Sequence, residues 1–162
     1  MCIPFRSITA FLVATFISLA SLAAEADIAV TDAIVRAVPP GTPNTAAYMT
    51  IRNGSATDRR LIRVDSPVAK TAELHNVIND NGVMKMRQVQ EILVKAKDKA
   101  ELKTGSYHIM LIDLKQKLNE GGTVPITLTF DNGSTVLIDT SVINPQATMQ
   151  LDKRMDHSGV KH

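Results

Sequence analysis

The feature that most limits how this chain can fold is a series of short apolar runs, each closed by a turn-forming sequence. Three of the runs read TAAYMTIRN, YHIMLIDL and VPITLTF, and the sequences between runs include PPGTPN, Asn-Gly and Asp-Asn-Gly. Short runs rich in β-branched residues are typical of β-strands. We count about seven to nine of them and find no long amphipathic helix after residue 26. The pattern predicts an all-β domain, an antiparallel sandwich or a Greek-key barrel.

The first 26 residues have the features of a secretory signal peptide. Arg6 precedes a long uncharged apolar run, and two sequences after it, SLA from Ser21 to Ala23 and AEA from Ala24 to Ala26, offer small residues at a cleavage site before a polar sequence begins. We therefore expect cleavage before residue 28 and release into the periplasm, without stable membrane insertion. An uncleaved membrane anchor is the alternative. No cysteine follows the apolar run, which argues against a lipid-anchored protein.

Export would also remove Cys2, the only cysteine of the chain. The folded domain, expected over residues 27–145, then has neither a disulfide nor a thiol nucleophile and depends on its hydrophobic core. Residues 146–162 follow the last strand pattern and are expected to form a flexible tail. A formal net charge of only +2 gives no electrostatic footprint for nucleic acid, and the chain has no Trp on which bases or sugars could stack.

One predicted hairpin brings a histidine and a methionine together. Asn81-Gly82 is a strong signal for a two-residue turn, and such a turn places His75 opposite Gln88 and residue 77 opposite Met86. His75 and Met86 are then diagonal neighbours on one face of the hairpin, within reach of long side chains. Met84 shares that face.

A second pair lies in the run YHIMLIDL, where His108 and Met110 are two residues apart and point to the same face of a strand. Brought together, the two pairs form a cluster of two imidazoles and two thioethers. Thioether sulfur is a soft, neutral donor that favours Cu(I) over Zn(II) or Mg(II), and imidazole binds several transition metals. The alternative is ordinary packing, in which the methionines are core residues, as we expect for Met49, and the histidines are incidental.

The spacing of His75, Met86, His108 and Met110 resembles the His-x10-Met-x21-His-x-Met signature of the PCuAC family of periplasmic copper chaperones. The segments RAVPPGTPNTAAYMTIRN, AELHNVINDNGVMKMRQV and YHIMLIDLKQKLNEGGTVPITLTF also look like family sequence, so the resemblance covers nearly the whole predicted domain. Ser106 and Asp113 depart from it, since glycine is common in the family at both positions.

The resemblance implies a cupredoxin-like Greek-key β-barrel or sandwich that binds Cu(I) through these four residues. It implies a monomeric carrier without enzymatic activity. The copper would pass toward the cytochrome c oxidase subunit that carries the CuA centre, in some family members alongside a Sco-type thiol protein.

The C-terminal tail contains Met149, Met155, His157 and His162, and so weakly resembles the His- and Met-rich extensions of some family members. A second copper at this tail is one reading, and a plain disordered tail is the other.

Three other classes of protein remain as alternatives to a carrier. A periplasmic copper storage or resistance protein would need more His and Met clusters than this chain has. A copper oxygenase would need a histidine at the mature N-terminus, and none stands near Glu25 or Asp27. No nucleophile–base motif or phosphate-binding glycine loop is present either. A structural sandwich or adhesin module would bind no copper at all.

Overall fold

The computed structural model describes residues 27–158, and in that range the chain forms ten strands and one helix. The predicted signal peptide, 1–26, lies outside the described residues. The elements in chain order are β1 (Ile28–Arg36), β2 (Thr45–Asn53), β3 (Arg59–Asp65), β4 (Ala69–Asp80), β5 (Val83–Gln88), β6 (Ile92–Val94), β7 (Lys99–Leu102), β8 (His108–Leu114), β9 (Thr123–Phe130), β10 (Thr135–Ile143) and α1 (Pro145–Ser158). The prediction of an all-β domain is confirmed.

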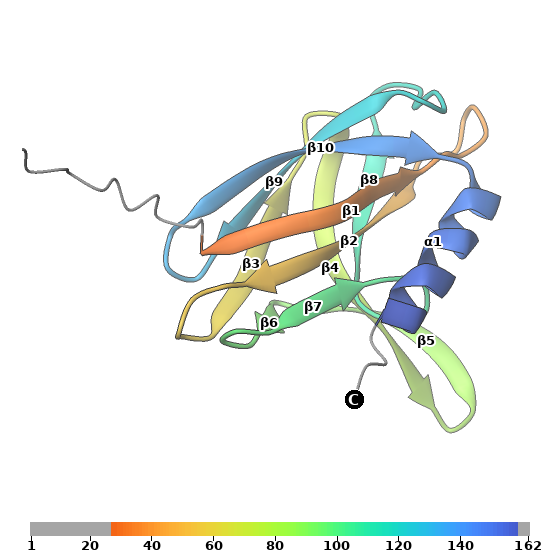
Figure 1. Ribbon diagram of the computed structural model, residues 1–162. Coiled ribbons are helices and arrows are strands. Elements are labelled where there is room, and N and C mark those ends of the chain that lie inside the picture. The colour runs from red at the N-terminus through yellow and green to blue at the C-terminus, as the bar shows by residue number, and fades with distance from the viewer. Residues whose placement is uncertain (1–26, 159–162) are drawn as a thin grey trace, which may run out of the picture.

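The strands form one continuous hydrogen-bonded sheet in the order β5-β4-β8-β2-β1-β10-β9-β3-β6. β7 pairs with the second half of β2, while the first half of β2 pairs with β8. The sheet curls until β3 contacts β4 and β6 contacts β7, which closes it into a barrel-like sandwich (Figure 1). Most pairs are antiparallel, and β1 with β10 is a parallel pair.

β2 is the central strand and is buried on both of its faces. Ala47, Met49 and Ile51 point into the main core, so the prediction that Met49 is a core residue is confirmed. Ala46 and Tyr48 point the other way, into a small second cluster that Met110 packs against. A strand buried on both sides reads as a near-continuous apolar run, as TAAYM does. Side chains of β2 thus pack against the outer face of β8 at Met110.

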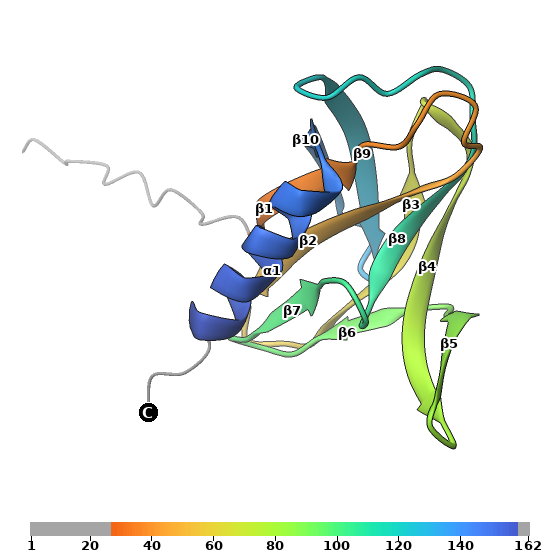
Figure 2. The same cartoon turned by 90° about the vertical axis from the view of Figure 1, so that its right-hand side faces the viewer.

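The β4–β5 hairpin has the predicted register. Asp80 pairs with Val83, Val77 with Met86 and His75 with Gln88. Asn81 and Gly82 have φ angles of 53° and 85°, as a type I′ turn requires at its two central positions. β5 lies at the end of the strand order and is exposed along its whole length. The hairpin therefore projects beyond the body of the barrel (Figure 2).

The C-terminal segment, expected to form a flexible tail, contains a helix from Pro145 to Ser158. The Asn144 side chain accepts a hydrogen bond from the Ala147 N–H at 2.8 Å, which makes Asn144 the N-cap, and a proline follows at the first helical position. Thr148 is fully buried, and α1 contacts β1. The sequence signal for this helix is its N-terminal Asn-Pro cap and not an apolar stripe. Between residues 27 and 158, no helix is long and apolar enough to cross a membrane.

Candidate metal site

Two neighbouring strands place the predicted site residues side by side. In the pairing of β4 with β8, His75 lies directly opposite His108, and Glu73 lies opposite Met110. β5 adds Met86 on the other side of β4 through its pairing with Val77. Three adjacent strands therefore carry the predicted ligands: Met86 lies on β5, His75 lies on β4, and β8 carries both His108 and Met110. All four predicted residues belong to one region of the sheet surface.

The two imidazole rings are close, and both are shielded from solvent. Their centroids are 5.8 Å apart with an interplanar angle of 45°. His108 is only 3% exposed, and the side chain of His75 is 15% exposed. The Tyr48 ring on β2 lies 6.3 Å from the His108 ring and covers it from the other side. The histidine pair is thus held in a mostly dry environment, although it stands on the outer face of the sheet.

Each imidazole has one nitrogen engaged and one left over. His75 Nε2 lies 2.8 Å from a Glu73 carboxylate oxygen, and His108 Nδ1 lies 2.9 Å from the Ser106 carbonyl oxygen. Both oxygens only accept, so the engaged nitrogens carry the protons. His75 Nδ1 and His108 Nε2 are then lone-pair donors, and both are buried with no hydrogen-bond partner among the described residues. Unpaired buried polar atoms are costly, and a cation would satisfy both.

The environment keeps His108 neutral. Burial lowers the pKa of the His108 imidazole below the ordinary value, and the electrostatic effects of the neighbouring His75 ring and the Arg36 guanidinium act in the same direction. The hydrogen bond to the Ser106 carbonyl opposes this shift without cancelling it. A neutral imidazole is the form that binds a metal, so the lone pair of His108 is free at neutral pH.

The two thioethers differ in their surroundings. Met110 is half-buried and packs against the second apolar cluster, while Met86 is 54% exposed on the edge strand. Met86, His108 and Met110 line one open concavity of about 390 Å³. Met84, on the same face of β5, is also exposed and does not line this concavity. The site therefore has one half-buried sulfur, from Met110, and one exposed sulfur, from Met86 on the edge strand.

Three residues of this region are absent from the sequence prediction. Glu73 bonds to His75, Tyr48 covers His108, and the Arg36 guanidinium stacks on the Tyr48 ring at 5.4 Å from its centroid. Arg36 also lines the concavity. Glu73 has a sequence signal, because it stands two residues before His75 in a strand and so shares its face. Tyr48 and Arg36 come from β2 and β1, and no short-range pattern points to them.

Histidine and carboxylate groups alone do not form a metal-binding cluster here. Across residues 27–158, no group of three or more His, Cys, Asp or Glu residues is placed to hold a metal ion. The donor set at this place consists of two imidazole nitrogens with methionine sulfur beside them.

Residues 28–142 match the model of a family described as LpqE-like, putative lipoprotein LpqE-like. The chain belongs to the LpqE-like family. Among curated relatives, this LpqE-like chain is 35% identical over 102 residues to an uncharacterized protein, RP573, of Rickettsia prowazekii, and 30% identical over 96 residues to a putative lipoprotein, Lxx21020, of Leifsonia xyli subsp. xyli. The matches cover 62% and 59% of the chain, and 56% and 58% of those two relatives. The LpqE-like chain thus spans somewhat over half the length of the relatives it matches.

Several solved structures resemble the LpqE-like chain. The solution structure of apo-DR1885 from Deinococcus radiodurans matches with a TM-score of 0.59 and 29% identity, covering 89% of this chain and 95% of that one. The CuI-DR1885 structure from the same organism matches with a TM-score of 0.58 and 34% identity, covering 68% and 74%. A copper-bound PCuAC domain from PmoF2 matches with a TM-score of 0.63 at 23% identity, covering 74% and 94%, which shows a shared fold. The cupredoxin-like architecture expected from the sequence is thereby confirmed.

Proposed function

We propose that this protein is an exported Cu(I) carrier that binds one copper ion through His75, Met86, His108 and Met110. The observation that supports it most strongly is the pair of unpartnered, lone-pair nitrogens, His75 Nδ1 and His108 Nε2, on facing residues of β4 and β8. These two buried nitrogens have no hydrogen-bond donor opposite them in the described part of the chain. A metal ion could accept the lone pair of each. The methionine sulfurs beside them are soft ligands that favour Cu(I).

Two further observations support copper as the cargo. The DR1885 relative was solved with Cu(I), and a PmoF2 domain of the same fold was solved with copper bound. The ligands proposed here are all neutral, and neutral soft donors suit a monovalent ion better than Mg(II) or Zn(II). Neither thioether nor imidazole forms a disulfide, so such a site works in an oxidising compartment without a reductase.

We propose further that the copper is delivered to the CuA centre of cytochrome c oxidase, directly or through a Sco-type thiol protein. The family resemblance suggests this destination, and ligand chemistry gives the direction of transfer. A thiolate acceptor holds Cu(I) more tightly than a thioether does, so copper moves toward a cysteine site. The signal-like first 26 residues support a periplasmic location for the carrier. In this role the protein transfers an ion and catalyses no reaction.

The decisive experiment is an anaerobic Cu(I) titration of the exported protein against a competing chelator. We expect one tightly bound Cu(I) per chain, and weaker binding of Zn(II) at comparable concentrations. Equal or tighter Zn(II) binding would contradict the proposed ligand set. Two or more tightly bound copper ions would favour storage or resistance over delivery. The direction of transfer is tested by mixing the Cu(I)-loaded protein anaerobically with a metal-free CuA domain, separating the two proteins and measuring the copper in each.

A further inference from the structure

We infer that Glu73 is a positioning residue for copper: its carboxylate fixes His75 as the Nε2–H tautomer, so that the ring offers Nδ1 to the metal. This inference rests on the proposed function and names how that same site is held in order. It also implies that the two histidines bind through different nitrogens, Nδ1 of His75 and Nε2 of His108.

The geometry of β4 is the first step. Glu73 and His75 are two residues apart in one strand, so both side chains project from the same face. The Glu73 carboxylate lies 2.8 Å from His75 Nε2, and the two side chains are 25% and 15% exposed. The pair is partly shielded from water, which strengthens the hydrogen bond relative to an exposed one.

The second step is the difference between the two nitrogens of His75. A carboxylate accepts and does not donate, so the proton of neutral His75 lies on Nε2 and the lone pair on Nδ1. Nδ1 is the nitrogen that is buried and without a partner among the described residues. The hydrogen bond therefore leaves the free lone pair on Nδ1 of a ring whose centroid lies 5.8 Å from that of the facing His108 ring.

The third step is a comparison with His108. Its Nδ1 is held by the Ser106 backbone carbonyl, which leaves Nε2 as the donor. One histidine is thus oriented by the backbone and the other by a side chain, and each keeps a different nitrogen for the metal. Outer-shell acceptors of this kind fix the ring orientation and raise the donor strength of the imidazole. Only the Glu73 contact can be removed by substitution.

The carboxylate has a second effect through its charge. A bound Cu(I) brings one positive charge into a region that already holds the Arg36 guanidinium near the Tyr48 ring. Glu73 is the anion that contacts a proposed ligand, and it offsets this charge without binding the metal itself. A carboxylate oxygen is a hard donor and suits Cu(I) poorly as a direct ligand.

The test uses the exported protein with Glu73→Ala, which removes the acceptor, and Glu73→Gln, which keeps an amide oxygen as acceptor but removes the charge. Glu91→Ala is the matched control, because Glu91 pairs with Arg60 and contacts no histidine. The first readout is the tautomer of His75 in the metal-free protein, from long-range ¹H–¹⁵N NMR at a pH where the imidazoles are neutral. The second is the Cu(I) affinity from chelator competition.

We expect wild type, Glu73→Gln and Glu91→Ala to show His75 protonated at Nε2, and Glu73→Ala to show mixed tautomers. Cu(I) affinity should fall by about 10- to 100-fold in Glu73→Ala. The loss should be smaller in Glu73→Gln and absent in Glu91→Ala. On adding Cu(I) to wild type, the ¹⁵N signals of His75 Nδ1 and His108 Nε2 should shift.

An Nδ1–H tautomer in the wild type would overturn the inference, and so would an unchanged tautomer and affinity in Glu73→Ala. If the wild type shows the expected tautomer but fails to compete for Cu(I), the carrier proposal fails, and Glu73 only stabilises the fold. If Glu73→Ala does not fold, the wild type still decides the inference, because a Cu(I)-induced ¹⁵N shift at His75 Nε2 instead of Nδ1 would overturn it.

Discussion

At the scale of single residues, the main feature of the site is a pair of histidine nitrogens without hydrogen-bond partners among the described residues. His75 and His108 each have one nitrogen bound to a fixed acceptor and the other left without a partner. Met110 is half-buried against Tyr48 and Ala46, so it could be taken for a packing residue. A packed methionine and a metal ligand respond differently to replacement by leucine, which has a similar volume but no donor atom.

The first prediction concerns Met110→Leu. The free energy of unfolding should change by no more than about 1.5 kcal/mol, because the substitution nearly conserves volume and apolarity. Cu(I) affinity should fall by more than about tenfold, equivalent to about 1.4 kcal/mol, because a ligand atom is lost. Chelator competition measures the affinity, and urea unfolding measures the stability.

Two methionines serve as controls for this prediction. Met49→Leu lies in the main core and should leave Cu(I) affinity unchanged. Met84→Leu should have an intermediate effect, since Met84 shares the site face of β5 but lies one residue pair nearer the turn. Equal Cu(I) binding by Met110→Leu and Met49→Leu would leave the carrier without its proposed sulfur ligand.

The second prediction concerns pH and the metal-free protein. The pKa of His108 is lowered in the folded state, chiefly by burial, so over the range below its ordinary value the unfolded chain holds more protons at this position than the folded one. Acid then favours unfolding, and His108 contributes stability that is present near pH 7 and lost as pH falls from about 6.5 toward the lowered pKa. Urea unfolding between pH 7.5 and 5 measures this trend.

His108→Gln is the comparison, because glutamine does not titrate and its carbonyl and amide can replace the ring contacts. The difference in unfolding free energy between wild type and His108→Gln should shrink as the pH falls. A difference that stays constant with pH would show that burial does not perturb this histidine.

At the scale of elements, the β4–β5 hairpin is the part of the site that the sequence predicts best. The Asn81-Gly82 turn fixes the register, and the register alone places Met86 diagonally from His75. The sequence does not give the pairing of His75 with His108, because β4 and β8 are separated by β5, β6 and β7 along the chain. Pairings of that kind depend on the whole topology.

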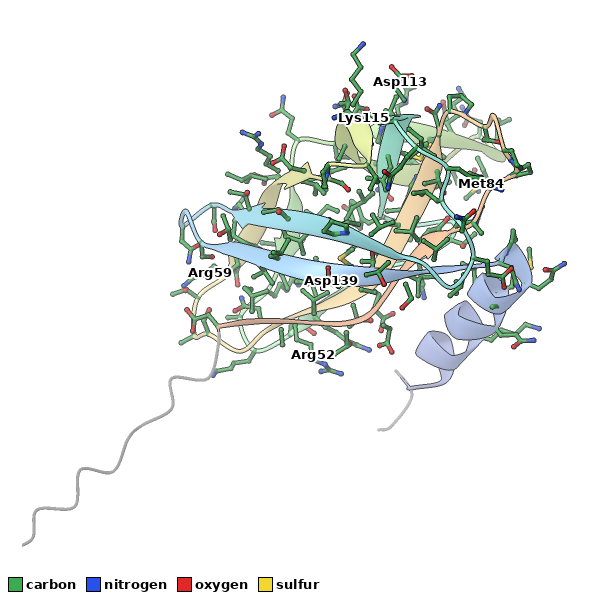
Figure 3. The ribbon with its side chains drawn as sticks, turned by 90° about the horizontal axis from the view of Figure 1, so that it is seen from above. Arg52, Arg59, Met84, Asp113, Lys115 and Asp139 are labelled. Atoms are coloured by element: carbon green, nitrogen blue, oxygen red, sulfur yellow. The ribbon has the colours of Figure 1, made fainter. Side chains whose placement is uncertain are left out.

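Two local features show why other parts of the chain escape prediction. Asp113 has a φ of 54°, a left-handed conformation that favours glycine, which is the residue that the family resemblance leads us to expect at this position. Its side chain points outward near Lys115 (Figure 3). The α1 helix begins at an Asn-Pro cap, which is only a short signal. Apolar periodicity in the sequence indicates neither feature, since neither one affects the pattern of core residues.

The third prediction concerns Gly82→Ala. A Cβ at this position meets nothing within 4 Å, so the cost comes only from the φ of 85° and should be about 1–2 kcal/mol. Because β5 is exposed and lies at the edge of the sheet, the damage should stay local to the hairpin. We expect faster hydrogen exchange in β5 and weaker Cu(I) binding through Met86, with the thermal midpoint changed little.

Asn81→Gly is the control for the hairpin, because glycine adopts the φ of 53° at this position without strain. It should leave hydrogen exchange in β5 and Cu(I) affinity close to wild type. If Gly82→Ala weakens the whole barrel as much as it weakens β5, the hairpin is not the independent unit that its exposure indicates.

At the scale of the whole molecule, one sheet supplies both the core and the site. Alternate side chains of β2 point into the main core, and those between them point to the opposite face, where they pack against Met110 of β8. The all-β class could be predicted from the sequence, because many short apolar runs with turn signals leave little room for another architecture. The strand order could not, since the parallel pairing of β1 with β10 joins the two ends of the domain.

The fourth prediction concerns where the mature protein begins. β1 starts at Ile28, which is buried and pairs with Asn53, so a cut beyond this residue would shorten a strand of the barrel. Mass spectrometry of the exported protein should therefore show an N-terminus before residue 28. Detection of the intact Met1 end in the exported fraction would contradict a cleaved signal peptide.

The position of Met86 on the exposed edge strand has a consequence for kinetics. His75, His108 and Met110 stand on strands with neighbours on both sides, whereas β5 pairs with β4 alone. A ligand on a compliant strand detaches more readily than ligands on a stiff one, so copper should lose Met86 before it loses any other donor. The remaining three-coordinate ion would then face outward with one vacant position. A cysteine of the acceptor protein could bind at this vacant position before the histidines dissociate, so that the ion is never free in solution.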